Sequence, residues 1–473
     1  MTAKPAAPTR SMRQLKALLG VDRAVLYTVL WRSWMALAAP INLLLVTRFL
    51  SPVAQGFFYT FGSILALQIL FELGLSQLIL QFTSHERSHL DWTANRTLEG
   101  GGSAKSRLAS LLRSSVAWYS TSAVLVVVLV LPVGMWLFGS SSHAGEAVNW
   151  QLPWVLFVVL SAMVFALLPV MAVLEGCGLV AEIALMRLGQ IISSCLLMWV
   201  VLWRGGGLFA LVAVKAVEVV WILGWLLLRH RAVLRDLLFT TPLTAVMDWR
   251  KEVWPVQWRT AVTWTSSLLI TPLFNPLLFA FDGPEAAGRM GLSISMIATI
   301  NTVGLAWIST KAPRFGGLIA RRRFQELDGI FFPALVRSTA VVVTASLVVI
   351  AGTLYLNAIG HPWSQRILSP LPMTLLATTA VVLHLIYSEA VYLRAHKAEP
   401  FVAVAVAVSV ATGVASVLLG SSFGATGICA GYLACMVAYL AFGTVIFQQK
   451  RRQWHAPGAH ELRAIPEVSR RIQ

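Results

Sequence analysis

Two arginines lie inside long apolar stretches of the sequence. A permanent charge is energetically costly in such a stretch, so it indicates a functional residue. Arg32 follows Trp31 near the start of one stretch, and Arg259 follows Trp258 in a later one. An arginine presents a planar, charged fork that suits the oxygens of a phosphate group. We therefore predict that both arginines contact a substrate from a cavity wall. The alternative, which stays open at this point, is that each side chain extends to the interface at the nearby helix end.

A polar stripe is predicted on the second apolar stretch. Gln68, Glu72 and Ser76 recur at intervals of four residues, which places them on one face of a helix. Three roles are open for Glu72: it neutralises Arg32, it accepts a proton, or it binds polar groups of a substrate. An ion pair of structural value with an inward-facing arginine is an equally open interpretation.

Two further charged pairs are predicted to behave differently from one another. Lys215 and Glu218 are three residues apart on one helical face, which favours a structural ion pair. Glu182 and Arg187 are five residues apart, or about 140° around a helix, so we expect them to face different neighbours. For Arg187, lining a cleft and bonding to a neighbouring helix are both open.

A third polar group occurs in a late apolar stretch. His384, Tyr387 and Ser388 share one helical face, and Glu389 lies beside them. Histidine changes its charge near neutral pH, so His384 is a candidate proton sensor. A histidine inside a membrane is more often a hydrogen-bond partner between helices, and that interpretation also stays open.

The elements that must hold these residues are long apolar helices. Of the 473 residues, 57% are hydrophobic and 12% are charged, which excludes an ordinary soluble protein. About 20 apolar residues in a helix cross the hydrocarbon core of a bilayer. We therefore predict an all-α integral membrane protein with about twelve transmembrane helices. The apolar stretches are 25–49, 54–82, 112–138, 152–174, 179–203, 207–228, 256–281, 286–310, 332–357, 370–393, 400–419 and 424–447.

Lysine and arginine fall mainly on one side of these stretches. The two ends of the chain and the connections on the same side as the ends hold 28 of the 37 basic residues. Because cytoplasmic loops carry the excess of lysine and arginine, both termini are predicted to be cytoplasmic. The formal charge of +17 is thus explained by membrane orientation, and no nucleic-acid partner is expected. The opposite connections are short and leave no room for a separate catalytic domain.

Recurring dipeptides suggest that the chain is an internal duplication. The dipeptide Trp-Arg at residues 31–32 recurs at residues 258–259. The dipeptide Arg-Ser lies near the start of the third stretch, at residues 113–114, and near the start of the ninth, at residues 337–338. Two halves of six helices would be related by an axis along the membrane normal, with a cleft at their junction, as is typical of transporters. The predicted divisions are a cytoplasmic segment at 1–24, an N-terminal six-helix lobe at 25–228, a basic cytoplasmic linker at 229–255, a C-terminal six-helix lobe at 256–447 and a basic cytoplasmic tail at 448–473.

The sequence of residues 48–76, RFLSPVAQGFFYTFGSILALQILFELGLS, carries a resemblance. It resembles the first helical hairpin of bacterial polysaccharide transport proteins. These are lipid-linked oligosaccharide flippases of the multidrug/oligosaccharidyl-lipid/polysaccharide exporter (MOP) superfamily. The resemblance implies a polyprenyl pyrophosphate substrate that carries sugars, with Arg32 and Arg259 facing phosphate and Glu72 ordering sugar hydroxyls. It also implies two lobes that rock to open a cationic cleft to each side in turn.

Motifs for covalent chemistry are missing from the sequence. It contains no GxxxxGK[ST] phosphate loop, no HExxH and no paired CxxC. We therefore expect no enzymatic activity, no metal ion and no cofactor. The four cysteines, which have no pairing pattern or metal-ligand spacing, are expected to pack as small apolar residues. They are Cys177, Cys195, Cys429 and Cys435.

The leading hypothesis is a flippase of the bacterial inner membrane. It would move polyprenyl-pyrophosphate-linked oligosaccharide units by alternating access for cell-surface polysaccharide biosynthesis, in contact with membrane lipids and polysaccharide assembly proteins. Its predicted substrate-binding residues are Arg32, Arg259, Arg187, Glu72 and Gln68. Its predicted coupling or gating residues are Glu72, His384 and Glu389.

Two other functions are weighed against the flippase. A proton- or sodium-coupled exporter of drugs or small cations from the same superfamily is the first alternative, and such a protein needs acidic groups in its cleft. A membrane glycan polymerase or ligase is the second. It is less consistent with the sequence, because such enzymes usually need a sizeable outer loop.

Overall fold

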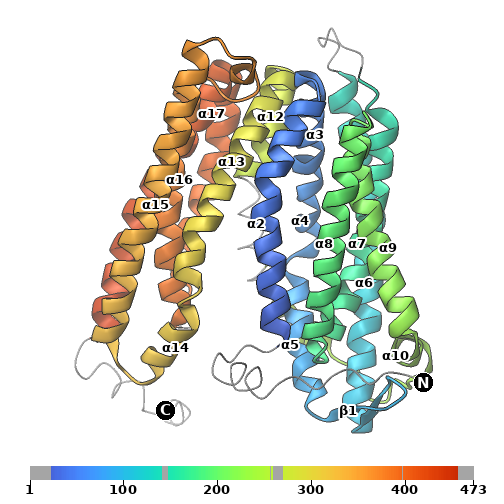
Figure 1. Cartoon of the computed structure of the whole chain (residues 1–473). Coiled ribbons are helices and arrows are strands. Elements are labelled where there is room, and N and C mark those ends of the chain that lie inside the picture. Colours follow the sequence, from blue (N-terminus) through green and yellow to red (C-terminus); the bar gives the residue numbers. More distant parts are fainter. Residues whose placement is uncertain are drawn as a thin grey trace, which may run out of the picture. The chain divides into compact units, whose positions relative to one another are not determined.

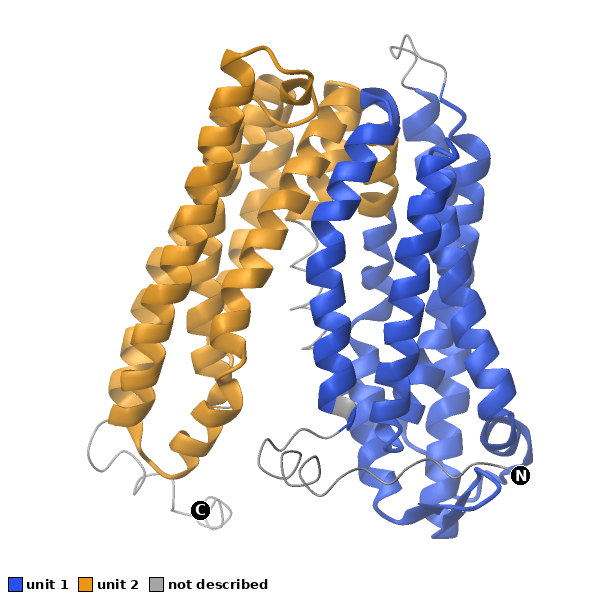
Figure 2. Ribbon diagram, viewed as in Figure 1, with its two compact units in different colours: residues 1–54, 65–140, 146–264 blue, residues 55–64, 141–145, 265–473 orange. Residues whose placement is uncertain are grey.

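The structure is a computed structural model of the 473-residue chain, and it describes residues 23–140, 148–255, 257–258, 261, 270–396 and 398–455. The chain divides into two compact units, which Figure 2 shows in blue and orange. Unit 1 comprises residues 1–54, 65–140 and 146–264. Unit 2 comprises residues 55–64, 141–145 and 265–473.

Unit 1 is a bundle of long helices, with one small sheet and short irregular turns at one end (Figure 1). Helix α6 is 38 residues long, or about 57 Å at 1.5 Å per residue, so it exceeds the thickness of a hydrocarbon core. Its first turns therefore extend beyond the predicted stretch and hold the irregular turns. The helices are α2 (Arg23–Phe49), α4 (Ile69–Glu72), α5 (Leu75–Arg87), α6 (Gly102–Gly139), α7 (Gln151–Gly176), α8 (Val180–Trp203), α9 (Phe209–Arg229) and α10 (Arg231–Arg235), with 3₁₀ turn η1 (Ala66–Gln68) and π-helical turns η2 (Asp236–Thr240) and η3 (Trp249–Val253).

Unit 2 is a second helical bundle. Most of helix α3 (Pro52–Leu65) belongs to it, although the residues on either side of 55–64 belong to unit 1. The other helices are α12 (Phe274–Phe281), α13 (Pro284–Ser309), α14 (Ala312–Ala320), α15 (Phe324–Ala358), α16 (Pro370–Ala395) and α17 (Val402–His455), with 3₁₀ turns η4 (Thr271–Leu273) and η5 (Pro362–Gln365).

The all-α, multi-pass membrane class is confirmed. Within the described ranges, ten helices are long and apolar enough to cross a membrane. Helix α17 covers most of the predicted stretch 400–419 and all of 424–447, and Gly424 at the start of the second stretch is non-helical. Of the predicted stretch 256–281, the shorter apolar segment Thr271–Phe281 is described as helical. The total of twelve helices and the cytoplasmic side of the termini stay predictions.

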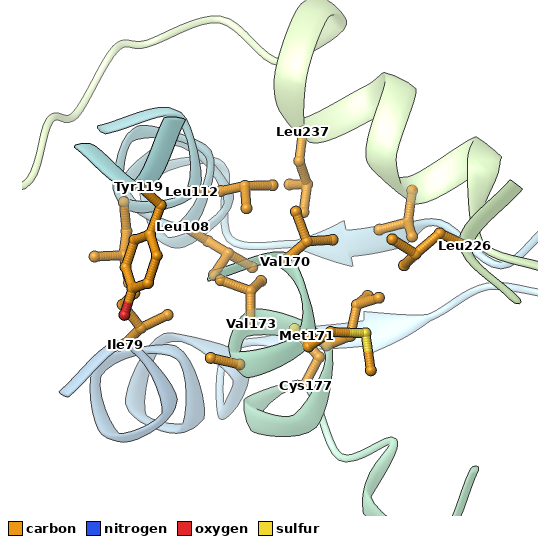
Figure 3. Close-up of a cluster of buried hydrophobic side chains, with 14 of the residues drawn as sticks. Ile79, Leu108, Leu112, Tyr119, Val170, Met171, Val173, Cys177, Leu226 and Leu237 are labelled. Atoms are coloured by element: carbon orange, nitrogen blue, oxygen red, sulfur yellow. The ribbon is translucent and has the colours of Figure 1, made fainter. Parts of the chain in front are cut away.

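Each unit has its own apolar core. In unit 1, side chains from α5, α6, α7 and α9 meet the segment after α9, as Figure 3 shows. The fully buried ring of Tyr119 packs there against Phe165, with ring centroids 4.9 Å apart. In unit 2, Phe331 on α15 contacts Tyr392 on α16 and Phe447 on α17. The four cysteines are free thiols and are buried or half-buried, as predicted for packing residues.

A small sheet in the connection before α6 was not predicted. Strands β1 (Leu90–Trp92) and β2 (Leu98–Gly100) pair in antiparallel fashion, with Asp91 opposite Glu99. The indole of Trp92 donates a hydrogen bond of 3.0 Å to the carbonyl oxygen of Cys177. The hairpin therefore satisfies a carbonyl group that the end of α7 leaves without a helical partner.

The predicted membrane-crossing stretch 54–82 overlaps the candidate span Pro52–Glu72, but it is not one continuous helix. The chain forms α3, then η1, then α4, and it restarts as α5 after a two-residue break. Leu73 (φ 52°) and Gly74 (φ 69°) both adopt the left-handed conformation at this break. Glycine accepts that conformation readily, whereas a leucine there is strained. The signal in the sequence was Gly74 itself, inside an otherwise helical pattern.

Candidate functional site

The helix break in unit 1 places polar groups within an apolar helix. At Leu73 and Gly74 the regular backbone hydrogen bonds stop, and unpaired backbone groups are costly in a membrane. The indole of Trp118 on α6 donates a bond of 3.3 Å to the carbonyl oxygen of Phe71. A side chain from the neighbouring helix thus replaces part of the lost backbone bonding.

Glu72 lies at this break and is part of a chain of hydroxyl groups. Ser76 Oγ donates to Glu72 Oε1 over 2.6 Å, and it lies 2.9 Å from the hydroxyl of Tyr119. Within the described ranges Glu72 forms no ion pair, so it does not neutralise Arg32 there. The roles of proton acceptor and substrate ligand remain open for this carboxylate.

Gln68 lies one turn before Glu72, in the 3₁₀ turn η1. Its side-chain oxygen is buried and has no hydrogen-bond partner among the described residues. A buried amide oxygen without a partner costs free energy unless a ligand or water donates to it. The broken helix therefore offers two acceptors, Gln68 and Glu72, close together in sequence.

Arg32 is exposed on α2. The buried face of α2 packs on α8, where Trp34 stacks on Trp199 and the Trp199 indole donates to Asn42 Oδ1 over 2.6 Å. Arg32 precedes Trp34 by two residues, which is about 200° around the helix. Its side chain therefore lies on the face of α2 turned away from α8, and in the described part of the chain it forms no ion pair.

Several other charged side chains, on α8 and α9, have charged partners. Arg187 Nη2 lies 3.1 Å from Glu175 Oε2 on α7, so the bond between helices, one of its two open roles, is present. Lys215 and Glu218 form the predicted pair, at 2.7 Å. Glu182 instead faces Arg96 and His230, which confirms that it and Arg187 have different neighbours.

The second predicted phosphate-binding arginine, Arg259, lies outside the described residues. The structure therefore does not test its predicted role, or the pairing of Arg259 with Arg32 across the two predicted halves.

Unit 2 contains a cavity of about 310 Å³ between η4, α13, α16 and α17. Its polar lining consists of hydroxyl and amide groups rather than charges. Asn301 Oδ1 is buried and has no hydrogen-bond partner among the described residues, so the cavity wall holds an acceptor that a bound donor would satisfy. The polar side chains that line it are Thr271, Asn301, Thr302, Thr379, Tyr387 and Tyr432.

His384 lies on α16 but does not line this cavity. It is buried, and its Nε2 lies 2.9 Å from Ser338 Oγ on α15. The hydrogen bond between helices that was one of its two open interpretations is therefore present, and a role for His384 as a gate stays a prediction.

Glu389 is buried near the end of α16. Thr444 on α17 donates to its Oε1 over 2.9 Å, while Oε2 has no hydrogen-bond partner within the described ranges. The carboxylate lines a cavity of about 330 Å³ together with Thr444, Arg451 and Arg452. With this geometry the Glu389 carboxylate could bind a proton or a small cation. It could equally serve as a polar contact that stabilises the packing of α16 on α17.

Among the described residues, the polar side chains of both candidate regions donate or accept hydrogen bonds. No group of three or more histidine, cysteine, aspartate or glutamate side chains that could hold a metal ion occurs among the described residues.

The comparisons with known proteins bear on the fold. No family model and no curated protein matches the chain. Among solved structures, an inward-facing multidrug resistance MATE family transporter of the MOP superfamily aligns with a TM-score of 0.61 at 12% identity, covering 89% of this chain and 95% of that one. The chain has the fold of the MOP superfamily.

Two further solved structures align with the chain over most of its length. The lipid II flippase MurJ in an inward closed conformation aligns with a TM-score of 0.56 at 11% identity, over 91% of this chain and 90% of MurJ. A mutant of the Vibrio cholerae MATE transporter VcmN aligns with a TM-score of 0.54 at 12% identity, over 96% of this chain and all of the other. The fold implied by the resemblance of residues 48–76 is thus confirmed, and the polysaccharide flippase family stays a prediction.

Proposed function

We propose that this chain is a MOP-superfamily flippase. It moves a polyprenyl-pyrophosphate-linked oligosaccharide across the bacterial inner membrane for cell-surface polysaccharide biosynthesis. The observation that carries the proposal is Arg32, an exposed arginine on an apolar helix that forms no ion pair among the described residues. The likeness in fold to the lipid II flippase MurJ supports it.

The pattern of charge pairing explains why Arg32 matters. Arg187 is paired with Glu175, and Lys215 with Glu218, so these two cations on α8 and α9 are already compensated. A charge retained within a membrane helix without such a partner is costly and points to a substrate or an ion pathway. The guanidinium fork of Arg32 matches the oxygens of a pyrophosphate better than it matches a cationic drug.

Transport of this kind requires no covalent chemistry. The sugars cannot cross hydrocarbon unaided, because each polar group without a hydrogen-bond partner costs several kcal/mol there. In the proposed mechanism the pyrophosphate binds Arg32, sugar hydroxyls bind groups such as Gln68 and Glu72, and the lipid tail stays in the bilayer. The two lobes then open the substrate site to each side in turn.

A specific observation favours a second function, a proton- or sodium-coupled exporter of small cations. Glu72 and Glu389 each accept a hydrogen bond from a hydroxyl group, and in the described part of the chain neither forms an ion pair. Carboxylates in such surroundings can bind protons or cations. Two of the similar structures are MATE transporters, which is consistent with this alternative.

One experiment separates the two functions. The gene is deleted, and lipid-linked glycan on the inner leaflet and resistance to cationic drugs are both measured. Complementation with Arg32→Ala should fail to clear the accumulated glycan although the protein inserts in the membrane normally. Complementation with Arg48→Ala, which removes an exposed charge at the other end of α2, should succeed.

Three results would contradict the flippase or the role of Arg32 in it. Full glycan transport by Arg32→Ala would assign that side chain to the interface. An unchanged glycan pool after deletion, with increased sensitivity to cationic drugs, would favour the exporter. Equal failure of the Arg48→Ala control would show that loss of charge anywhere on α2 is harmful, and Arg32 would lose its special role.

A further inference from the structure

The segment that follows α9 lies on unit 1 with one buried face. Val233, Leu237 and Val253 have no exposed side-chain surface, and Met247 is nearly buried. All four belong to the apolar core of unit 1, and Leu237 is labelled in Figure 3 above the α6 residues Leu108 and Leu112. Residues 231–253 are therefore a docked element rather than a loose connection.

Polar contacts with the first turns of α6 hold this segment in place. Arg113 donates from Nε to the carbonyl oxygen of Leu237 over 3.0 Å and from Nη2 to that of Thr241 over 2.7 Å. Ser106 Oγ donates to the carbonyl oxygen of Ala245 and accepts from its amide, each over 2.9 Å. These bonds fix the backbone, so the outward-facing side chains are presented in a defined arrangement.

The outward side chains of the segment include large apolar groups. Phe239 is 81% exposed and Val246 58% exposed, and Leu228 at the end of α9 is 86% exposed. Exposed apolar surface directly after a membrane-crossing helix is typical of an element that lies in the membrane interface. The segment thus continues from α9 with an apolar surface suited to acyl chains.

A charged cavity of about 840 Å³ lies between the start of this segment, the β-hairpin and α6. Lys105 is neutralised there by Asp236, at 2.8 Å. Arg231 and Arg235 are exposed, and neither forms an ion pair within the described ranges. Glu99 is the one remaining acid in the lining, so the two arginines leave the cavity with a positive charge.

We propose that this cavity binds the headgroup of an anionic phospholipid, with Arg231 and Arg235 on the phosphate and the acyl chains against Phe239 and its apolar neighbours. A phosphate group would also be offered by a soluble anion such as pyrophosphate. The exposed apolar side chains on the same segment favour a lipid, because a soluble anion has no use for them. The proposal stands independently of the transported substrate.

The test uses the full-length protein, purified in detergent and examined by native mass spectrometry. Phosphatidylglycerol and phosphatidylcholine are each titrated, and the bound lipid is counted. Phosphatidylglycerol should bind more tightly, and Arg231→Gln with Arg235→Gln should weaken it by about tenfold or more, since each basic residue near an anionic lipid contributes on the order of 1 kcal/mol.

The matched control is Arg250→Gln with Lys251→Gln. It removes the same charge from exposed positions on the same segment that do not line the cavity. This control should change phosphatidylglycerol binding by less than about threefold, since charges off the site contribute only through the screened surface potential. Size-exclusion profiles identical to the wild type verify folding of both variants.

A third variant identifies the source of the phosphate. Phe239→Ser should weaken phosphatidylglycerol binding and leave the affinity for inorganic pyrophosphate unchanged. Unchanged phospholipid binding in Phe239→Ser, combined with displacement of the lipid by pyrophosphate, would overturn the lipid assignment in favour of a soluble anion. Equal losses in the cavity variant and its matched control, or no preference for phosphatidylglycerol, would overturn the site altogether.

Discussion

Each unit has a network of ion pairs and hydrogen bonds that joins its elements, and the central residues of the two networks carry opposite charges. In unit 1 a cation is central: Arg107 on α6 bonds to Glu86 at 2.8 Å and to Glu252 at 2.6 Å. In unit 2 an anion is central: Asp328 on α15 accepts from Arg451 at 2.6 Å and from the Tyr392 hydroxyl at 2.8 Å. In each case the central group joins two other elements. The removal of the central group should therefore cost more than the removal of any one partner.

Burial ranks the two networks. Tyr392 has no exposed surface and Asp328 has a side chain 16% exposed, whereas the Arg107 side chain is 28% exposed. Water can replace partners of a half-exposed arginine, but it reaches a buried tyrosine hydroxyl poorly. Loss of the central group should therefore destabilise the anion-centred network of unit 2 more than the cation-centred network of unit 1.

The largest expected effect is therefore that of Asp328→Ala. It leaves Arg451 without its carboxylate and the buried Tyr392 hydroxyl with one hydrogen-bond partner, His455 Nε2 at 3.1 Å, in place of two. This loss should lower the free energy of unfolding by about 2–3 kcal/mol. Denaturant unfolding in detergent, followed by tryptophan fluorescence, measures the loss. Glu99→Ala, at an exposed strand position, is the control and should have almost no effect. A loss under about 0.5 kcal/mol would rank Asp328 with exposed pairs and break the comparison.

Removal of the central residue of the cation-centred network should lower the free energy of unfolding by a smaller amount. Arg107→Met leaves Glu86 and Glu252 without the cation that they share. This change should lower the free energy of unfolding by about 2 kcal/mol. Arg107→Lys should recover only part of this, because an ammonium group cannot bridge both carboxylates as a guanidinium fork does. Arg250→Met is the matched control from an exposed position. If Arg107→Lys had the same free energy of unfolding as the wild type, the positive charge alone would account for the effect of Arg107.

The helix interruptions provide a third comparison between the units. Gly424 has φ 55° and ψ −139°, a conformation that only glycine adopts easily, and a Cβ there would collide with the carboxylate of Asp282. Gly74 has φ 69° and ψ 14°, which other residues reach with moderate strain. Gly424→Ala should therefore lower the free energy of unfolding by about 2 kcal/mol or more, and Gly74→Ala should lower it by about 1 kcal/mol. Equal losses in the same unfolding assay would show that the backbone relaxes at both sites.

The smallest expected effect is a dependence of stability on pH. Burial lowers the pKa of His230 in unit 1 and of His396 in unit 2, so the unfolded chain takes up protons first as the pH falls. Both histidines should therefore make the protein less stable at pH 5.5 than at pH 8. His230→Gln and His396→Gln should each flatten this slope. An unchanged slope in both variants would assign the pH dependence to other groups.

Glu252 acts in a different pH range. Its hydrogen bond with Arg107 lowers the pKa of the Glu252 carboxyl, so the stabilisation is complete above the ordinary pKa of a glutamate. It is lost only as the pH falls through the depressed value. The contribution of Glu252 to the free energy of unfolding therefore stays constant between pH 8 and pH 5.5.

Much of the architecture could be predicted because the signals are local. Apolar length predicted the membrane helices, and the spacing of Lys215 and Glu218 predicted their pair. The break at Gly74 was missed because one glycine in a helical pattern has several explanations. The β-hairpin at 90–100 was missed because its strands are three residues long and carry no clear alternation.

The site could be predicted only in part. Arg32 and Glu72 were recognised because charges within apolar runs are rare, but their partners were not. Glu72 bonds to Ser76 on its own broken helix rather than to Arg32, and Arg187 bonds to Glu175 on α7. The cavity around Asn301 was missed, although an asparagine in an apolar helix was an available signal.

The many membrane crossings of this chain and the charges inside its apolar helices follow from the sequence alone, because hydrophobic length and residue type decide these properties. Which charges are neutralised depends on the packing of helices, because Glu175 meets Arg187, and Asp328 meets Arg451, only in the folded chain. The tertiary structure likewise decided that residues 231–253 dock on α6 with their arginines outward, since burial depends on neighbours that are far away in sequence.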